Sequence, residues 1–172
     1  MLHYLFVPFF KPFYIKFKNN NMTKVLIALD YNPSAQLIAE KGHQLAKAMQ
    51  AEVCLVHVVA DASYYAVDYS PIMGFGGFNT ANSIELIEEL KKQAGEFLLS
   101  AAKHLGDAHV KTMILEGDSA DAILTYADEY NADIIVIGSH SHSGLDTLLL
   151  GNVPAKILKH TKKPLFIIPT GQ

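Results

Sequence analysis

Two glycines 13 residues apart frame a segment whose residue types suit the binding of an anion. The segment reads GSHSHSGLDTLLLGNVPAKILKH and runs from Gly138 to His160. An unbroken apolar run ends at Gly138, and a helical pattern begins at Gly151 and Asn152, with Asn152 predicted as the N-cap. Glycine lets a backbone approach a ligand closely, and a helix N-terminus offers unpaired N–H groups to an anion such as a nucleotide phosphate. The pattern also describes an ordinary loop-to-helix connection, so it leaves both interpretations open.

Composition limits how such an anion could be held. The formal net charge of −3 and a pI near 6.2 give no electrostatic reason to expect a nucleic acid partner. All 14 basic residues are lysine, so the bidentate guanidinium clamp is missing and backbone N–H groups, hydroxyls or lysines must bind the anion. The single cysteine, Cys54, lies in the apolar run VCLVHVV and is expected to be a buried thiol. A reducing, cytoplasmic setting fits this cysteine usage.

The first 21 residues differ in composition from the rest of the chain. They carry seven Phe and Tyr and three Lys with no acidic residue, and Pro8 and Pro12 exclude a continuous helix. Lysines interrupt the apolar run before it reaches the ~20 residues of a membrane span, so a membrane partner is not expected. Residues 1–21 are interpreted as a disordered tail or a start assigned too far upstream, with a peripheral membrane or partner-binding tail as the alternative. Residues 22–172 are predicted to form a single domain.

From Met22 onward, strand and helix patterns alternate. Strands are expected at 24–29, 53–59, 109–115, 133–137 and 164–168, and helices at about 34–49, 83–105, 119–130 and 152–160. Continuously apolar strands are typical of a parallel sheet that is covered on both faces. The predicted fold is therefore α/β and doubly wound. In such sheets ligands bind beyond the carboxyl ends of the strands, which here bring Asp30, Val58 and Gly138 to one edge.

The chain from Thr23 to Pro169 resembles the universal stress protein family. The resemblance is carried by the segments KVLIALDYNPSA, LVHVV, EGDSADAIL, DIIVIGSHSHSGL and LLLGNVPAKILKHTKKPLFIIP. It implies a Rossmann-like, five-stranded parallel sheet of order 3-2-1-4-5 and a homodimer formed through the last strand, Pro164 to Ile168. It also implies binding of ATP, ADP or AMP, with or without Mg²⁺.

The resemblance assigns a role to each part of the nucleotide site. Asp30, next to Leu29, would lie by the ribose or a phosphate-bound metal, and the Val58 backbone would meet the adenine edge. Ile137 and Gly138 would line the base and ribose. The residues expected at the phosphates are Ser141, Gly151, Asn152, Val153 and Pro154.

This chain departs from the family's nucleotide-binding pattern of Gly, two residues, Gly, nine residues, Gly and then Ser or Thr. Ser141 replaces the second glycine, and Asn152 stands at the Ser or Thr position. Pro154 fits the first turn of a helix but removes one N–H donor from the anion site. The adenosine half of the expected site is intact, and the phosphate half is weakened.

Other polar residues have simpler interpretations. His140, His142 and His160 lack the Cys or carboxylate ligands of a zinc site, so no metal site is predicted. His57 is expected to be a core histidine whose polar atoms are satisfied, and Asp118 and Asp121 to be helix-start residues. No nucleophile has an assignable base, so no catalytic residue is predicted, and any ATP hydrolysis would be slow.

One long connection has no assigned role. The segment 60–82 contains a GFGGF centre with aromatic residues on both sides. It would either cover a ligand, widen a dimer contact or act as a mobile linker.

The sequence is compatible with two functions. The first is a stress-response regulatory protein that binds ATP or another adenine nucleotide at the carboxyl ends of strands one and four. The alternative is a dimeric interaction or chaperone-like stress protein of the same fold that has lost nucleotide binding.

Overall fold

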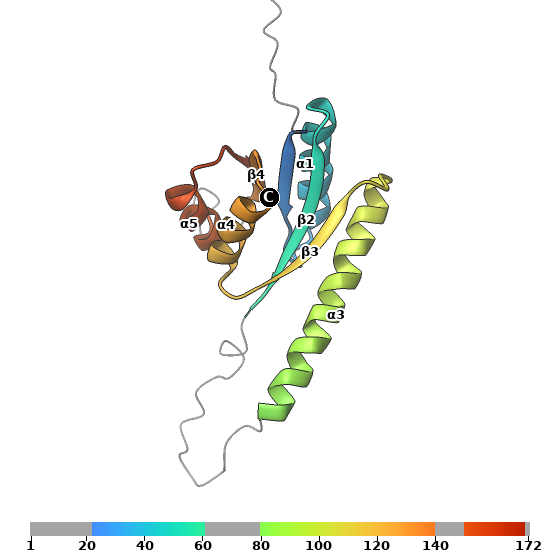
Figure 1. Cartoon of the computed structure of the whole chain (residues 1–172), viewed down its shortest axis with the longest axis vertical. Coiled ribbons are helices and arrows are strands. Elements are labelled where there is room, and N and C mark those ends of the chain that lie inside the picture. The colour runs from blue at the N-terminus through green and yellow to red at the C-terminus, as the bar shows by residue number, and fades with distance from the viewer. Residues whose placement is uncertain (1–21, 61–79, 140–149, 171–172) are drawn as a thin grey trace, which may run out of the picture.

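A five-stranded parallel sheet forms the centre of the molecule. The computed structural model describes residues 22–60, 80–139 and 150–170, with the side chains of residues 80–84 left undescribed. The strand order is β3-β2-β1-β4-β5 and all neighbouring strands are parallel, which confirms the predicted doubly wound α/β fold and its order. Helices α1 and α3 cover one face of the sheet, and α4 and α5 cover the other (Figure 1).

The elements follow one another as alternating strands and helices. They are β1 (Lys24–Ala28), α1 (Ala35–Ala48), β2 (Glu52–Val59), α3 (Thr80–Leu105), β3 (Lys111–Glu116), α4 (Ser119–Glu129), β4 (Ile134–Gly138), α5 (Asn152–His160) and β5 (Leu165–Ile168).

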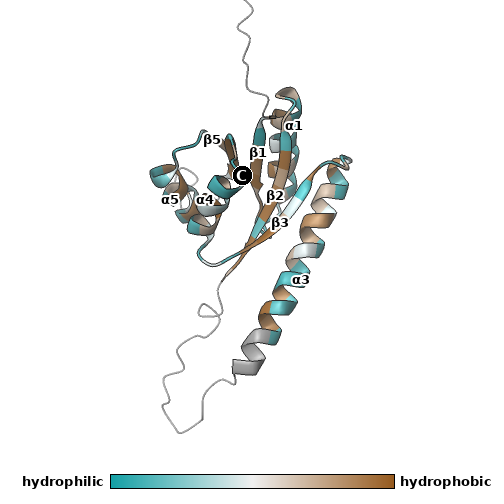
Figure 2. Cartoon of the chain, viewed as in Figure 1, coloured by the Kyte–Doolittle hydropathy of each residue, from teal (hydrophilic) through white to brown (hydrophobic). Residues whose placement is uncertain are grey.

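The central strands β1, β2 and β4 are mostly apolar because each face of the sheet buries alternate residues. On β1, Val25 and Ile27 pack in the cluster beneath α1 and α3, whereas Leu26 packs in the cluster beneath α4 and α5. All three side chains are fully buried. Figure 2 shows hydrophobic residues along β1 and β2, while hydrophobic and hydrophilic residues alternate along α3. A strand covered on both faces leaves no position for a polar side chain, which explains the unbroken apolar runs in the sequence.

Two elements begin two or three residues away from the predicted start, and all other starts agree with the prediction within one residue. Helix α3 begins at Thr80, three residues before the expected start, which shortens the connection after β2. Strand β3 begins at Lys111 and not at His109. The reason is a turn at Asp107, whose carboxylate accepts the His109 N–H at 2.9 Å and whose carbonyl accepts the Val110 N–H at 3.3 Å. These bonds hold the two residues outside the strand ladder.

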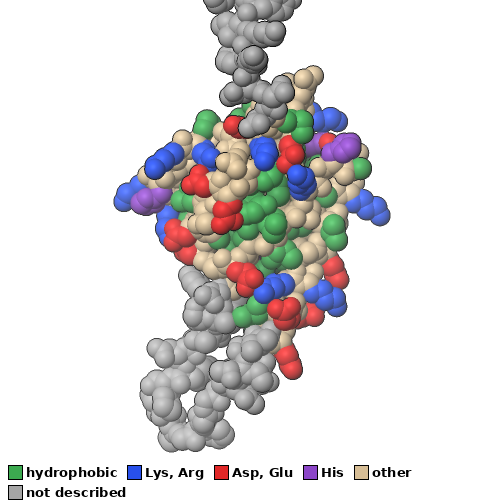
Figure 3. Space-filling model, viewed as in Figure 1, with side chains coloured by type: hydrophobic (Ala, Val, Ile, Leu, Met, Phe, Trp, Pro, Cys, Tyr) green, Lys and Arg blue, Asp and Glu red, His purple; other side chains and the backbone are tan. Residues whose placement is uncertain are grey.

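The described surface is mixed in character. Hydrophobic side chains gather in the middle of the face seen in Figure 3, and charged side chains lie around its rim. Among the helices of the described residues, none has the length and apolar character needed to cross a membrane. Residues 1–21 and nearly all of the connection after β2 lie outside the described residues.

Candidate functional site

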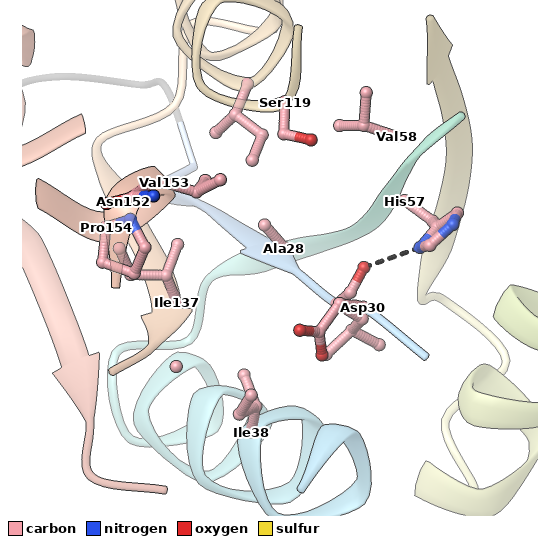
Figure 4. Close-up of a pocket in the computed structure, with 13 residues that line it drawn as sticks. Ala28, Asp30, Ile38, His57, Val58, Ser119, Ile137, Asn152, Val153 and Pro154 are labelled. Atoms are coloured by element: carbon pink, nitrogen blue, oxygen red, sulfur yellow. Dashed lines mark hydrogen bonds between the residues drawn. The ribbon is translucent and has the colours of Figure 1, made fainter. Parts of the chain in front are cut away.

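A cavity of about 460 Å³ opens at the carboxyl ends of β1, β2 and β4. It lies between α1 on one side and the N-terminal turns of α4 and α5 on the other (Figure 4). Its lining is mostly apolar. The lining residues are Ala28, Leu29, Asp30, Ile38, His57, Val58, Ser119, Ile123, Ile137, Gly138, Asn152, Val153 and Pro154. All of the site residues expected from the sequence except Ser141 and Gly151 are among them.

Asp30 is the only carboxylate among the described residues that line the cavity. It follows β1 directly, in the connection to α1, and is half-buried. The Asn32 N–H donates to the Asp30 Oδ1 at 3.3 Å, and the Asn32 side chain in turn accepts from the Ser34 N–H at 3.2 Å. These two turns start α1 and hold the carboxylate at the edge of the sheet, where it can accept hydrogen bonds from a ligand hydroxyl or contact a cation.

His57 is buried and hydrogen-bonded, as the sequence predicted, and it also lines the cavity. Its Nδ1 lies 2.8 Å from the Leu29 carbonyl oxygen, a group that only accepts, so the proton is on Nδ1. Burial lowers the pKa of His57 from its ordinary value of 6.5, against smaller opposing effects from the Leu29 carbonyl and Asp30. Burial thus favours the neutral imidazole.

The main chain of Val58 faces the cavity because β1 ends before β2 does. In a parallel ladder, successive residues direct their N–H and C=O groups to opposite neighbouring strands. The Val56 carbonyl accepts the Leu29 N–H at 2.9 Å, and the Val59 carbonyl accepts the Gly117 N–H on the opposite side at 3.1 Å. Val58 therefore points its amide and carbonyl toward β1, beyond the last strand residue, Ala28. One donor and one acceptor lie side by side there.

Gly138 ends β4 and leaves room for the Ile38 side chain of α1. A Cβ at this position would lie 2.6 Å from the Ile38 Cδ1 and 3.1 Å from the Thr170 Cγ2. Such a contact is far shorter than normal van der Waals separation, so the space that the glycine leaves is used by α1. The sequence analysis inferred that a glycine here lets the backbone approach a ligand. In the structure, the group that lies closest to Gly138 is the Ile38 side chain of α1.

The N-terminus of α5 differs from the prediction by one residue. Gly151 is the N-cap, with φ −59° and ψ 160°, and Asn152 is the first helical residue without a capping side-chain bond. The prediction of Asn152 as N-cap was wrong, because the Gly151 carbonyl accepts the first helical bond, from the Ala155 N–H at 2.9 Å. The Gly151 N–H donates to the Ser139 carbonyl at 3.2 Å. This bond ties the glycine to the end of β4, and the helix starts directly after it.

The first turn of α5 has fewer donors than an ordinary helix. Four N–H groups are normally unpaired at a helix N-terminus. Here the Gly151 N–H is used by Ser139, and Pro154 has none, as the sequence predicted. The N–H groups of Asn152 and Val153 have no partner among the described residues. Two donors therefore remain for an anion.

The start of α4 forms the wall of the cavity next to α5. Asp118 is the N-cap of α4 and accepts the N–H groups of Ala120 and Asp121, as expected for helix-start residues. The Lys156 Nζ lies 3.1 Å from the Asp118 Oδ1 and 2.9 Å from the Asp121 Oδ2, which joins α5 to α4. The pKa of Asp118 is lowered, first by the Asp121 N–H and then by Lys156. Lys156, the lysine nearest in sequence to the α5 N-terminus, is therefore already paired with two carboxylates.

Sequence reasoning missed five residues of the cavity: Ala28, Ile38, His57, Ser119 and Ile123, of which His57 was expected only as a core residue. Three are apolar and are indistinguishable in sequence from other core positions. Ser119 is different, because its hydroxyl faces the cavity beside Val58 (Figure 4) and has no hydrogen-bond partner among the described residues. Its place directly after an N-cap gave a signal for a helix start but none for a ligand.

Some predicted features fall outside the described residues. Ser141 does so, as do His140 and His142 of the histidine loop. His160 is described and is exposed at the end of α5. Within the ranges that the structure describes, no three His, Cys, Asp or Glu side chains gather as metal ligands.

The fold and the cavity together define the class of the protein. It is a doubly wound α/β protein with a ligand cavity at the carboxyl edge of its sheet, apolar along the walls and polar at Asp30, Val58 and the α5 N-terminus. The sequence pattern of the Universal stress protein family matches residues 21–169, which is most of the chain. The chain belongs to this family.

Individual relatives agree with this assignment. A universal stress protein of Methanocaldococcus jannaschii, MJ0531, is 31% identical over 152 residues, which cover 87% of this chain and 83% of the relative. The solved structure of UspA from Lactobacillus plantarum is similar with a TM-score of 0.68 at 18% identity, over 87% of this chain and 99% of that one. A universal stress protein from Archaeoglobus fulgidus, solved in complex with dAMP, is similar with a TM-score of 0.53 at 20% identity, over 86% and 98% of the two chains.

Proposed function

We propose that this chain is a stress-response regulatory protein that binds an adenine nucleotide at the carboxyl ends of β1 and β4. The observation that carries the proposal is one cavity with three polar features in a row: the Val58 main chain, the Asp30 carboxylate and the α5 N-terminus. These suit a base, a ribose and a phosphate in turn. The dAMP complex of the A. fulgidus relative supports the same ligand class.

The base is assigned to the β2 end of the cavity. Adenine presents an amino donor beside a ring nitrogen acceptor, and Val58 presents a carbonyl acceptor beside an amide donor. A planar base can therefore pair with this backbone in the manner of an additional strand. Apolar side chains from α4 and β4, Ile123 and Ile137, supply the flat contact surface that a purine needs.

The phosphate is assigned to the first turn of α5. The N–H groups of Asn152 and Val153 and the positive end of the helix dipole favour an anion there. Among the described residues of this turn only two N–H donors remain, the chain has no arginine, and Lys156 is paired with Asp118 and Asp121. We therefore propose weak discrimination among ATP, ADP and AMP, with Mg²⁺ compensating phosphate charge near Asp30 when ATP is bound.

A binding role fits the cavity better than a catalytic one. The proton on His57 Nδ1 is directed to the Leu29 carbonyl, and the Ser119 hydroxyl has no hydrogen-bonded base among the described residues. A nucleophile requires such a base, so we propose at most slow hydrolysis of bound ATP.

We further propose that the protein is a cytoplasmic homodimer formed through β5. This strand is at one edge of the sheet, and its Phe166 side chain is 41% exposed. An edge strand with an exposed aromatic residue is suited to pairing with a second copy.

Two measurements on the purified full-length chain test the proposal. Mass spectrometry of small molecules released on denaturation should detect an adenine nucleotide, and calorimetry should give saturable binding of ATP and AMP at one site per chain. Failure of both, with a folded dimer, would favour the alternative of an interaction or chaperone-like protein that has lost the nucleotide.

A further inference from the structure

The buried imidazole of His57 contacts the residues on both sides of Asp30. Its Nδ1 donates to the carbonyl of Leu29, which precedes Asp30, at 2.8 Å. The ring of Tyr31, which follows Asp30, lies against the imidazole with centroids 4.3 Å apart and planes tilted by 53°. One side chain on β2 therefore holds the backbone before Asp30 and the side chain after it.

A second aromatic ring fixes this arrangement from α3. The Phe97 ring lies 5.7 Å from the His57 ring in an edge-to-face orientation and 4.9 Å from the Tyr31 ring. His57 is 7% exposed, whereas Tyr31 is 56% exposed and forms the outer layer of the group. Three rings in mutual contact restrict one another's rotamers more than any single pair would.

The Asp30 carboxylate depends on this group for its direction. The backbone leaves the ladder after the Leu29 N–H bonds the Val56 carbonyl at 2.9 Å, so strand pairing no longer fixes Asp30. Within its own connection, the Asn32 N–H donates to the Asp30 Oδ1 at 3.3 Å. The two contacts of His57 restrain the backbone before Asp30 and the side chain after it, so they limit how far the carboxylate can move from the position that the Asn32 bond holds.

We propose that His57 is a positioning residue for Asp30 and thereby sets the affinity of the cavity for the ribose hydroxyls of its ligand. This inference rests on the proposed nucleotide function. It adds His57 as a residue that acts through Asp30 and does not itself contact the ribose hydroxyls. The chemistry is a hydrogen bond between a ribose hydroxyl and a carboxylate, which is strong only when the carboxylate is held in place.

The test compares ATP with 2′,3′-dideoxy-ATP, which lacks the ribose hydroxyls that Asp30 would accept. Calorimetry gives the ratio of the two dissociation constants for each variant. Wild type should bind ATP about 10- to 100-fold more tightly, since a hydrogen bond to a charged group contributes about 1.5–3 kcal/mol. Asp30→Asn should reduce the ratio severalfold, because the amide oxygen accepts only a weaker, neutral hydrogen bond, while the dideoxy affinity stays within about threefold of wild type.

Two substitutions of His57 separate its contacts. His57→Phe keeps a ring against Tyr31 and Phe97 but removes the donor to Leu29, and it should lower the ratio to about that of Asp30→Asn. His57→Asn places an amide N–H at the position of Nδ1 and should restore most of the ratio. In the Asp30→Asn background, His57→Phe should have no further effect on the ratio. Should the His57 variants fail to fold, Tyr31→Ala, at an exposed residue, should lower the ratio partially by removing one of the two contacts.

Each remaining outcome is decisive. Equal weakening of ATP and dideoxy-ATP by His57→Phe would overturn the inference and leave His57 as a structural residue only. A wild-type ratio near one would overturn it while leaving the proposed nucleotide site intact. Binding of neither nucleotide by wild type would overturn the proposed function and this inference with it.

Discussion

The amide of Gly151 donates a hydrogen bond to the carbonyl of Ser139 at 3.2 Å. This bond joins the start of α5 to the end of β4, two points that are 12 residues apart in the sequence. It brings the helix N-terminus to the same edge as Asp30 and Val58, and it also removes one N–H from those available to a ligand. The bond that places the α5 N-terminus at the proposed anion site therefore also reduces the number of donors there.

Pro154→Ala should strengthen phosphate binding. The substitution restores an N–H in the first turn of α5, where Asn152 and Val153 supply the only two unpartnered donors of the described first turn. One charge-assisted bond contributes about 1.5–3 kcal/mol, so ATP affinity should rise by about one to two decades while adenosine affinity changes little. Calorimetry with ATP, AMP and adenosine measures this. Lys159→Ala at the other end of the helix is the control, and equal gains for adenosine and ATP would contradict the argument.

Gly151→Val should abolish binding of both ATP and AMP. Gly151 is buried at the point where α5 meets β4, so a branched side chain there would block approach to the N–H groups that follow. Its φ of −59° is accessible to valine, so the effect would come from space and not from backbone strain. Unchanged adenosine binding together with lost AMP binding would confine the damage to the phosphate end.

The sequence was sufficient for the fold because both faces of the sheet are covered. Runs such as DIIVI could be recognised as buried strands, and the helices between them had clear apolar stripes. The residues of the cavity were harder to predict from the sequence than the fold. Asp30 and Val58 could be named because they lie at the carboxyl ends of strands, whereas Ser119 and Ile38 reach the cavity only through the packing of α4 and α1. The N-cap was misplaced by one residue because glycine and asparagine both occur as N-caps, and the local pattern does not decide which carbonyl accepts the first helical bond from Ala155.

Phe166→Lys should convert the proposed dimer toward monomer. Phe166 is 41% exposed on the edge strand β5, so a charge there would be buried against the partner copy. Analytical ultracentrifugation at micromolar concentration measures the shift. Leu99→Lys is a matched control, because Leu99 is 63% exposed on α3. A monomeric wild type, or equal shifts for the two variants, would argue against β5 as the contact.

A chain that starts at Met22 should be nearly as stable as the full chain. The first backbone bond of the described domain is formed at Thr23, whose carbonyl accepts the Glu52 N–H at 2.8 Å. Chemical unfolding of the two chains should give free energies within about 1 kcal/mol of each other. A larger loss would mean that the aromatic segment before Met22 packs on the domain.

Stability should fall as the pH drops below about 6.5, in part through His57. Burial lowers the pKa of His57 in the folded chain below its ordinary value of 6.5. The unfolded chain then binds the proton first, so this contribution is complete above pH 6.5 and is lost as the pH falls through the folded pKa. The slope is at most about 1.4 kcal/mol per pH unit for one proton.

The His57→Asn variant isolates this contribution because asparagine does not titrate. Urea unfolding from pH 7 to pH 5 should show a steeper loss of stability for wild type than for the variant. The charged group that faces the ring is Asp30, which raises the pKa and so reduces the effect. Parallel pH profiles for the two proteins would show that His57 does not change its protonation on unfolding.

Gly138→Ala should destabilise the fold through α1, and shortening Ile38 should relieve part of the loss. The added Cβ would lie 2.6 Å from the Ile38 Cδ1, and overpacking of this kind typically costs about 1–3 kcal/mol. Ile38→Val removes that methyl group and alone should cost about 0.5–1.5 kcal/mol. If the contact with Ile38 is the main steric conflict, the double variant should lose less stability than the sum of the losses of Gly138→Ala and Ile38→Val. The double-mutant cycle measures this coupling free energy. Additive losses would instead place the conflict at Thr170, whose Cγ2 would lie 3.1 Å from the same Cβ.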